Sequence, residues 1–213
     1  MTLKWFGHSC FLLTDSRGVR ILTDPFDPET GYNLEKTEAE IVTCSHNHHD
    51  HHYVEAAAGN PKIIDKPGEY EVNGVRIKGV KTFHDDAKGV KRGENTVFIF
   101  DVDGMRIAHF GDIGEIPDES TLNEIGDIDV MLVPIGGNYT IGHTEALQLA
   151  NLVKTNVLIP MHYSTPDVKF KLGPLAPMLR EAKNCKIHKL NQPEATLTRE
   201  SLGEDRLLVL TYK

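Results

Sequence analysis

The segment Ser45-His46-Asn47-His48-His49-Asp50-His51-His52 holds five of the chain's eleven histidines within seven residues, together with an aspartate. The pattern H-x-H-x-D-H is met by four of its positions: His46, His48, Asp50 and His51. Imidazole and carboxylate groups are the ligands that zinc and neighbouring transition metals prefer. Two pairs of such ligands this close together can serve two metal ions rather than one. The segment therefore predicts a metal site, and a metal pair is a catalytic device.

This segment begins where the β-rich run 40–44 ends. A loop that leaves a rigid strand can be exposed and still be held in place. In an extended loop His46 and His48 project to the same side, whereas Asp50 and His51 follow a turn and can reach a second point. A solvated loop that happens to be rich in histidine is the alternative, which four matched positions after a strand disfavour.

Two metal ions need more than these four residues, because each usually takes three or four protein ligands. Further candidates should lie at other strand ends, directly after apolar β-like runs. Three residues meet this condition: His84, Asp112 and His162. Each of them alone has the features of an ordinary loop residue, but together they supply the missing number of ligands.

Composition limits the classes of protein that the chain can represent. Its length fits one domain, residues 1–213, and a formal net charge of −8 without a basic arm argues against a nucleic-acid partner. No apolar run approaches the length of a membrane span, and Met1 leads into a strand-like segment rather than a signal peptide. The irregularly spaced Cys10, Cys44 and Cys185 suit buried thiols in a reducing cytoplasm. We therefore expect a cytoplasmic protein that acts on a small molecule.

The order of expected elements changes along the chain. Short β-like runs fill the first half, and Asn73-Gly74 and Asp103-Gly104 predict tight hairpin turns between them. A short helix is expected at Tyr53–Ala58. Helical spacing then appears in three later segments: Pro117–Ile125, Thr144–Lys154 and Leu175–Lys183. Early meanders followed by alternating strands and helices favour an α+β or α/β sandwich with helices on the outer sheet faces.

The order of the candidate ligands, with H-x-H-x-D-H followed by a histidine, a Gly-Asp pair and a last histidine, resembles the metallo-β-lactamase superfamily. Local phrases resemble its branch of small metal-dependent hydrolases that includes L-ascorbate 6-phosphate lactonase. These phrases include Trp5-Phe6-Gly7-His8-Ser9-Cys10, Leu22-Thr23-Asp24-Pro25, Gly93-Glu94-Asn95-Thr96, Gly111-Asp112-Ile113-Gly114 and Ile159-Pro160-Met161-His162-Tyr163. The resemblance covers most of the chain and implies an α+β fold, an αββα four-layer sandwich.

The resemblance also implies a ligand set. The first metal would be bound by His46, His48 and His84, and the second by Asp50, His51 and His162. Asp112 would bridge both metals, and Asp24 would hold a ligand histidine in the right tautomer. His8 and His109 are expected beside the ligands or in packing. His49 and His52 alternate with ligand positions, so they are expected to point away.

Two divalent ions, with zinc favoured over manganese or iron, would hold a bridging hydroxide that attacks an ester, lactone or phosphodiester bond. Asp112 stands where the antibiotic-hydrolysing branch has a cysteine, so β-lactamase activity is not expected. A general acid should protonate the leaving group. Asp50 is the first candidate, and Tyr139, His143 and Tyr163 are weaker ones for which a structural role is at least as good an interpretation.

The loop after His84 carries Lys88, Lys91 and Arg92. Arg92 can clamp a phosphate or carboxylate, which predicts a small anionic substrate, while a solvated basic loop is an equal alternative. Two other functions fit the same ligands. One is an RNA or nucleotide phosphodiesterase on this fold, and the other is a non-catalytic metal-binding or sensing protein.

Overall fold

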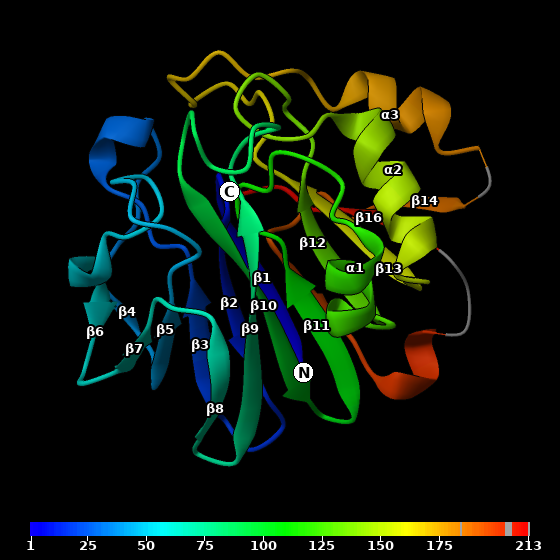
Figure 1. The fold of residues 1–213 in the computed structure, drawn as a ribbon. Coiled ribbons are helices and arrows are strands. Elements are labelled where there is room, and N and C mark those ends of the chain that lie inside the picture. Colours follow the sequence, from blue (N-terminus) through cyan, green and yellow to red (C-terminus); the bar gives the residue numbers. More distant parts are fainter. Residues whose placement is uncertain (184, 203–205, 213) are drawn as a thin grey trace.

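Two β-sheets pack against each other in the computed structural model, which describes residues 1–183, 185–202 and 206–212 (Figure 1). Within these residues the first sheet has six strands in the order β15-β1-β2-β3-β5-β7, and the second has eight in the order β14-β16-β13-β12-β11-β10-β9-β8. Both sheets begin as antiparallel meanders along the chain and continue with parallel strands.

The first sheet contains β1 (Thr2–Gly7), β2 (Cys10–Thr14), β3 (Arg20–Thr23), β5 (Ile41–Thr43), β7 (Lys62–Ile64) and β15 (Glu194–Thr196). The second contains β8 (Gly68–Val72), β9 (Val75–Phe83), β10 (Glu94–Val102), β11 (Met105–His109), β12 (Val130–Pro134), β13 (Val157–Met161), β14 (Lys186–Lys189) and β16 (Arg206–Val209). A separate pair is formed by β4 (Thr37–Glu38) and β6 (Ala57–Ala58). The helices are α1 (Glu119–Ile125), α2 (His143–Leu152) and α3 (Ala176–Glu181), and the 3-10 turns are η1 (Pro28–Thr30), η2 (Val54–Ala56) and η3 (Arg199–Leu202).

Each face of the first sheet has its own apolar cluster, because successive residues of a strand point to opposite faces. Ile21 and Ile41 join the main core together with side chains of the second sheet. Their neighbours Leu22 and Val42 belong to a second cluster with Phe26. The segment between β3 and β5 therefore covers the outer face of the first sheet.

The three α-helices cover the second sheet on the side away from the first (Figure 1). Helix α1 contacts β9, α2 contacts β12, and α3 packs on α2. The fold is thus an α+β sandwich, as the sequence predicts, and among the described residues its α-helices lie on the second sheet, while the segment between β3 and β5 covers the first. None of the helices in the described part of the chain is long and apolar enough to cross a membrane.

The prediction of a helix at Tyr53–Ala58 is wrong. The structure has one 3-10 turn at Val54–Ala56, and Ala57–Ala58 then pairs with β4. Tyr53 provides no side-chain cap for a helix start. A helix of six residues is too short to be stable alone, so strand pairing satisfies the backbone instead.

The two hairpin turns are formed as predicted. Asn73 and Gly74 have φ angles of 52° and 74°, and Asp103 and Gly104 have φ angles of 50° and 73°. Two successive residues with positive φ are the signature of a type I′ turn, whose twist matches that of the flanking strands. The turns lie at the ends of β9 and β11 opposite to the ends that lead into His84 and Asp112.

The ring of Phe100 gives a test of the core. It is fully buried in β10, between Ile77 of β9 and Ile107 of β11. Phe100→Ala should lower the free energy of unfolding in urea by about 3–5 kcal/mol, because the lost ring leaves a cavity. Val90→Ala, at a side chain that is 85 % exposed, should change it by less than about 0.5 kcal/mol. Similar losses in both variants would contradict this view of the core.

Candidate metal centre

The strands that precede the candidate ligands end at one end of the sandwich, the upper end in Figure 1. Strands β9 and β11 both run antiparallel to β10, and β13 runs parallel to β11 through β12. These three strands therefore end at the same edge of the second sheet, and β5 of the first sheet ends beside them. The residues that follow the four strand ends include His46, His84, Asp112 and His162.

Among the described residues, four groups of donor atoms are close enough to hold a cation, with every pair in a group within 4.8 Å, and two of these groups flank Asp112. The first group contains His46, His48 and His84. The second contains His8, Asp50, His51 and His162. Apart from His8, this division matches the two ligand sets that the family resemblance implies. Residues far apart in the sequence thus meet as two compact sets of nitrogen and oxygen donors.

Asp112 lies between the two groups and is 2 % exposed. Its Oδ2 atom is 3.5 Å from Nε2 of His84 in the first group. The same atom is 3.3 Å from Nε2 of His51 and 3.2 Å from Nε2 of His162 in the second group. One carboxylate therefore contacts both sets of donors.

The arrangement fits divalent cations. A metal–nitrogen distance of about 2.1 Å places neighbouring donors about 3.0 Å apart in an octahedron and about 3.4 Å apart in a tetrahedron. The distances around Asp112, 3.2, 3.3 and 3.5 Å, lie in or close to this range. In addition, Nε2 of His46, Nε2 of His51 and Oδ1 of Asp112 are buried without a hydrogen-bond partner among the described residues. Buried polar atoms normally have partners, so these three atoms indicate where a cation would bind.

Asp24 orients two of the histidines from behind. Its Oδ1 accepts the Ser45 backbone N–H at 2.8 Å, and its Oδ2 accepts the Ser45 hydroxyl at 2.5 Å and Nδ1–H of His51 at 2.7 Å. Ser45 Oγ in turn lies 3.0 Å from Nδ1 of His46. Both rings therefore use Nδ1 for these bonds and direct Nε2 toward the metal groups, as outer carboxylates commonly ensure.

His109 lies next to Asp24 but forms its hydrogen bond with another residue. Its Nε2–H donates to the Ser9 carbonyl at 2.7 Å, and its Nδ1 lies 4.0 Å from Oδ2 of Asp24. The side chain is fully buried. Its place beside Asp24 agrees with the packing role expected for it.

The charges of the centre suit a cation. Burial alone would raise the pKa of Asp112, but His162 and His51 outweigh it and hold that pKa well below its usual range. Burial alone would lower the pKa of His51, but the carboxylates of Asp112 and Asp50 raise it well above its usual range. The same ionised carboxylates would attract a divalent cation to the centre.

His8 is expected beside the ligands or in packing, and it belongs to the second donor group itself. Its Nε2 is 3.1 Å from Oδ2 of Asp50, and its ring centroid is 4.3 Å from that of His162. Burial, and then His162, lower the pKa of His8 to about 4. The imidazole is therefore neutral near pH 7 and donates Nε2–H to Asp50.

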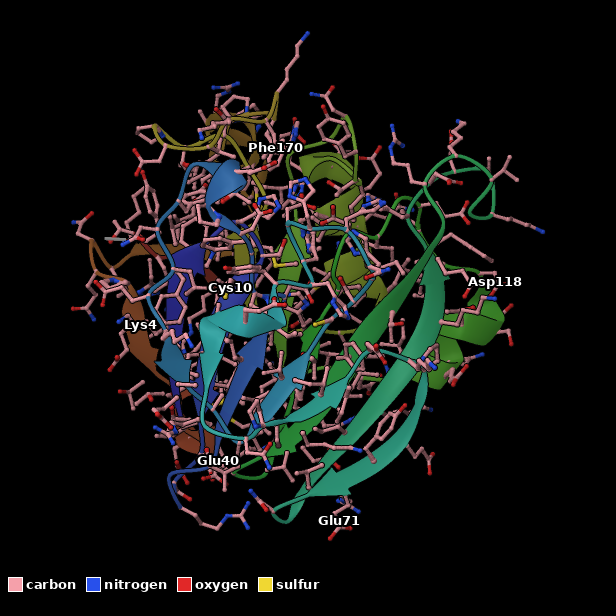
Figure 2. All side chains as sticks on the ribbon, turned by 90° about the vertical axis from the view of Figure 1, so that its left-hand side faces the viewer. Lys4, Cys10, Glu40, Glu71, Asp118 and Phe170 are labelled. Atoms are coloured by element: carbon pink, nitrogen blue, oxygen red, sulfur yellow. The ribbon has the colours of Figure 1, made fainter. Side chains whose placement is uncertain are left out.

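An aromatic side chain covers this end of the centre. The ring of Phe170, in the loop after β13, lies 5.5 Å from that of His8. Figure 2 shows Phe170 at the same upper end, far from Glu40 at the base of the first sheet. Phe170 therefore forms an apolar wall beside the second group of donors.

The three weaker general-acid candidates lie outside both donor groups. Tyr163 packs on Trp5 with a centroid distance of 5.4 Å, and burial raises the pKa of its hydroxyl. His143 begins α2 and lies 3.0 Å from a carboxylate oxygen of Glu181 on α3. Tyr139 is 40 % exposed on the loop after β12. Of the four candidates, Asp50 is the one whose carboxylate lies within a donor group.

The two remaining histidines of the motif segment pair with other aspartates. His49 Nδ1 is 2.9 Å from Oδ2 of Asp27, and His52 Nε2 is 3.6 Å from Oδ2 of Asp65. Neither histidine belongs to the two donor groups around Asp112. Their alternation with the candidate ligands thus places them on the other side of the loop.

Asn95 is a buried residue next to Asp112 whose contacts the sequence pattern does not predict. Its Nδ2 donates to the Thr82 hydroxyl at 2.8 Å and to the Phe110 carbonyl at 3.0 Å, while its Oδ1 accepts the backbone N–H of Asp112 at 2.9 Å. This buried amide ties the ends of β9, β10 and β11 together. The phrase Gly93-Glu94-Asn95-Thr96 marks the position in the sequence but does not indicate these partners.

Asp24→Asn tests the role assigned to the buried carboxylate. An amide cannot accept from Ser45 and His51 as an ionised carboxylate does, so metal affinity should fall about 10- to 100-fold. Competition with a chromophoric chelator measures the affinity. Asp127→Asn is the matched control, since Asp127 pairs with Lys154 and belongs to none of the donor groups. Equal losses in both variants would exclude a specific role for Asp24.

Asn95→Leu tests the link between strand ends. The apolar side chain leaves the Phe110 carbonyl and the Asp112 N–H unpaired, which should cost about 1–3 kcal/mol of unfolding free energy. Metal affinity should fall as well, because Asp112 loses its anchor. Asn151→Leu, on the exposed face of α2, should change neither quantity. Unchanged metal affinity in Asn95→Leu would show that Asn95 supports the fold alone.

Comparisons with known proteins agree with this geometry. A family model described as the beta-lactamase superfamily domain matches residues 2–162. A UPF0173 metal-dependent hydrolase from Thermococcus onnurineus is 32 % identical in an alignment 191 positions long, and the match covers 76 % of this chain and 84 % of that protein.

Solved structures show the same relationship. The crystal structure of a candidate Zn-dependent hydrolase of the metallo-beta-lactamase superfamily from Thermotoga maritima is 41 % identical. It has a TM-score of 0.83 and covers 98 % of this chain and 97 % of that chain. An isothiocyanate hydrolase from Delia radicum gut bacteria, 13 % identical, shares the fold with a TM-score of 0.67 over 100 % of this chain and 97 % of that chain. This chain is therefore a metal-dependent hydrolase that belongs to the metallo-β-lactamase superfamily.

Proposed function

We propose that the centre holds two divalent metal ions and hydrolyses an ester, lactone or phosphodiester bond in a small anionic substrate. His46, His48 and His84 would hold the first ion, and Asp50, His51 and His162 the second. Asp112 would be shared. Because all donors are nitrogen or oxygen, zinc is the favoured metal, with manganese and iron as alternatives.

One observation carries this proposal. Oδ2 of Asp112 lies within 3.2–3.5 Å of Nε2 atoms from both donor groups. A single-metal site would not need a buried carboxylate between two sets of histidines. A shared carboxylate is the usual means by which two cations are kept close together despite their mutual repulsion.

Bound there, two divalent cations would lower the pKa of a water molecule and stabilise negative charge that develops on the substrate. The protein contributes proton transfer. Asp50 is ionised, because His51 and the hydrogen bond from His8 outweigh the effect of burial on its pKa. As an ionised carboxylate, Asp50 would be the group that accepts a proton from water and returns it to the leaving group. The hydrogen bond from His8 Nε2–H to Oδ2 would hold the carboxylate in place.

A cytoplasmic location is part of the same proposal. Cys10 and Cys44 are buried free thiols, as expected, whereas Cys185 is only half-buried. Burial raises the pKa of Cys10 and Cys44. Such thiols are protonated and unreactive near pH 7, which suits a structural role in a reducing compartment.

Asp112→Asn tests the two-metal proposal directly. The amide cannot bridge two cations, so the purified variant should retain at most one metal ion per chain, as measured by elemental analysis. Hydrolysis of 4-nitrophenyl esters, lactones and bis(4-nitrophenyl) phosphate should fall by about 100-fold or more. Asp127→Asn removes an exposed carboxylate paired with Lys154 and should behave as the wild type.

Two results would overturn the proposal. Undiminished turnover in Asp112→Asn would exclude the shared carboxylate from the mechanism. Stoichiometric metal in the wild type with no chelator-sensitive turnover of any of these substrates would instead identify a metal-binding protein without this activity.

A further inference from the structure

A cavity of about 410 Å³ opens beside the first donor group. It is bounded on one side by the motif loop and on the other by the segments around residues 65–67 and 92–96. Its lining includes His46, His48, Asp65, Lys66, Arg92 and Glu94. A small molecule with one end at the metal centre can therefore extend into this space.

The charged side chains that line the cavity differ in whether they have a partner of opposite charge. Glu94 forms an ion pair with Lys81, and Asp65 lies 3.6 Å from His52. Lys66 and Arg92, in contrast, form no ion pair within the described part of the chain. With Lys81 included, three cationic side chains face two carboxylates here, so positive charge is in excess.

The position of Arg92 is fixed by neutral groups rather than by an acid. Its Nη2 donates to the Asn138 carbonyl at 3.2 Å, and its guanidinium carbon lies 5.7 Å from the centroid of Tyr139. The side chain is half-buried. A carbonyl and an aromatic face hold the guanidinium without neutralising it, so most of its donors stay available.

The backbone beneath Arg92 is equally well fixed. The carboxylate of Asp85 accepts the backbone N–H groups of Arg92 at 2.7 Å, Ala87 at 2.8 Å, Gly89 at 2.9 Å and Lys91 at 2.9 Å. One buried side chain thus sets the shape of the whole loop. A preformed cation loses little conformational freedom when it binds an anion, which favours affinity.

We propose that Arg92 and Lys66 form an anion subsite that receives a carboxylate or phosphate group of the substrate, at the end remote from the bond that is cleaved. This inference rests on the proposed hydrolytic function of the adjoining centre. The substrates would be esters or lactones whose acyl part carries an anionic group at the end away from the bond that is cleaved. The subsite gives the enzyme selectivity for substrate charge, separate from the chemistry of the metal centre.

Two esters with the same leaving group measure this selectivity. Mono-4-nitrophenyl glutarate and 4-nitrophenyl valerate differ mainly in a terminal carboxylate or methyl group. The wild type should prefer the glutarate ester in kcat/KM by about tenfold, the value of one well-formed charge-assisted pair. Arg92→Gln should bring the ratio close to one, and Lys66→Gln should lower it less. Lys91→Gln is the matched control and should keep the wild-type ratio, since Lys91 pairs with Asp86 outside the cavity.

Calorimetric titration measures anion binding directly and so tests the subsite without any turnover. The protein is used as purified, with its metal bound. Glutarate and inorganic phosphate, titrated separately, distinguish a carboxylate from a phosphate ligand. The favoured anion should bind about tenfold more weakly to Arg92→Gln and unchanged to Lys91→Gln. Equal affinities in the wild type and both variants would overturn the subsite, because the anion would then bind the metals alone. Absence of hydrolysis with the Arg92-dependent binding intact would instead contradict the proposed reaction.

Discussion

The centre depends on the hydrogen bonds that the buried carboxylate of Asp24 accepts. A charged group with no exposed surface is costly unless every oxygen is paired. Asp24 meets this condition only because Ser45 and His51 both bond to it, which fixes the two ends of the motif loop at once. Its backbone has a φ of 39°, a conformation that the surrounding bonds must maintain. These hydrogen bonds hold both ends of the loop and orient the rings of His46 and His51.

The centre also requires that glycines lie in close contact with the loops that carry the candidate ligands. A Cβ at Gly111 would lie 2.4 Å from the Cβ of Ser45, one at Gly114 would lie 2.2 Å from the backbone N of Asp85, and one at Gly136 would lie 2.2 Å from the His162 carbonyl oxygen. Any side chain there would push a ligand-bearing loop outward. The glycines that flank Asp112 thus serve the geometry of the centre and not only the flexibility of a turn.

The sequence predicts those features that depend on local order. Alternation along the strands, the Asn-Gly and Asp-Gly turns and the candidate ligands after strands are all visible in short windows. Contacts between distant residues are not visible in such windows, and the roles of Asp24 and Asp112 could be expected only from the resemblance to a family. His8 joins the second donor group across 42 positions to Asp50, and Asn95 reaches Asp112 across 17. Tyr53–Ala58 fails for the same reason, because pairing with β4 decides a segment whose own helical preference is weak.

The separation between turns and ligands along β9 has a practical consequence. This strand has the Asn73-Gly74 turn before its first residue and His84 after its last, and its nine residues span roughly 30 Å. The protein is thus polarised, with its chemistry at one pole and a tight, exposed hairpin at the other. A tether introduced at that hairpin would hold the molecule on a sensor or a resin with its centre facing the solution. Immobilised in this orientation, the hydrolase would remain fully accessible to substrate.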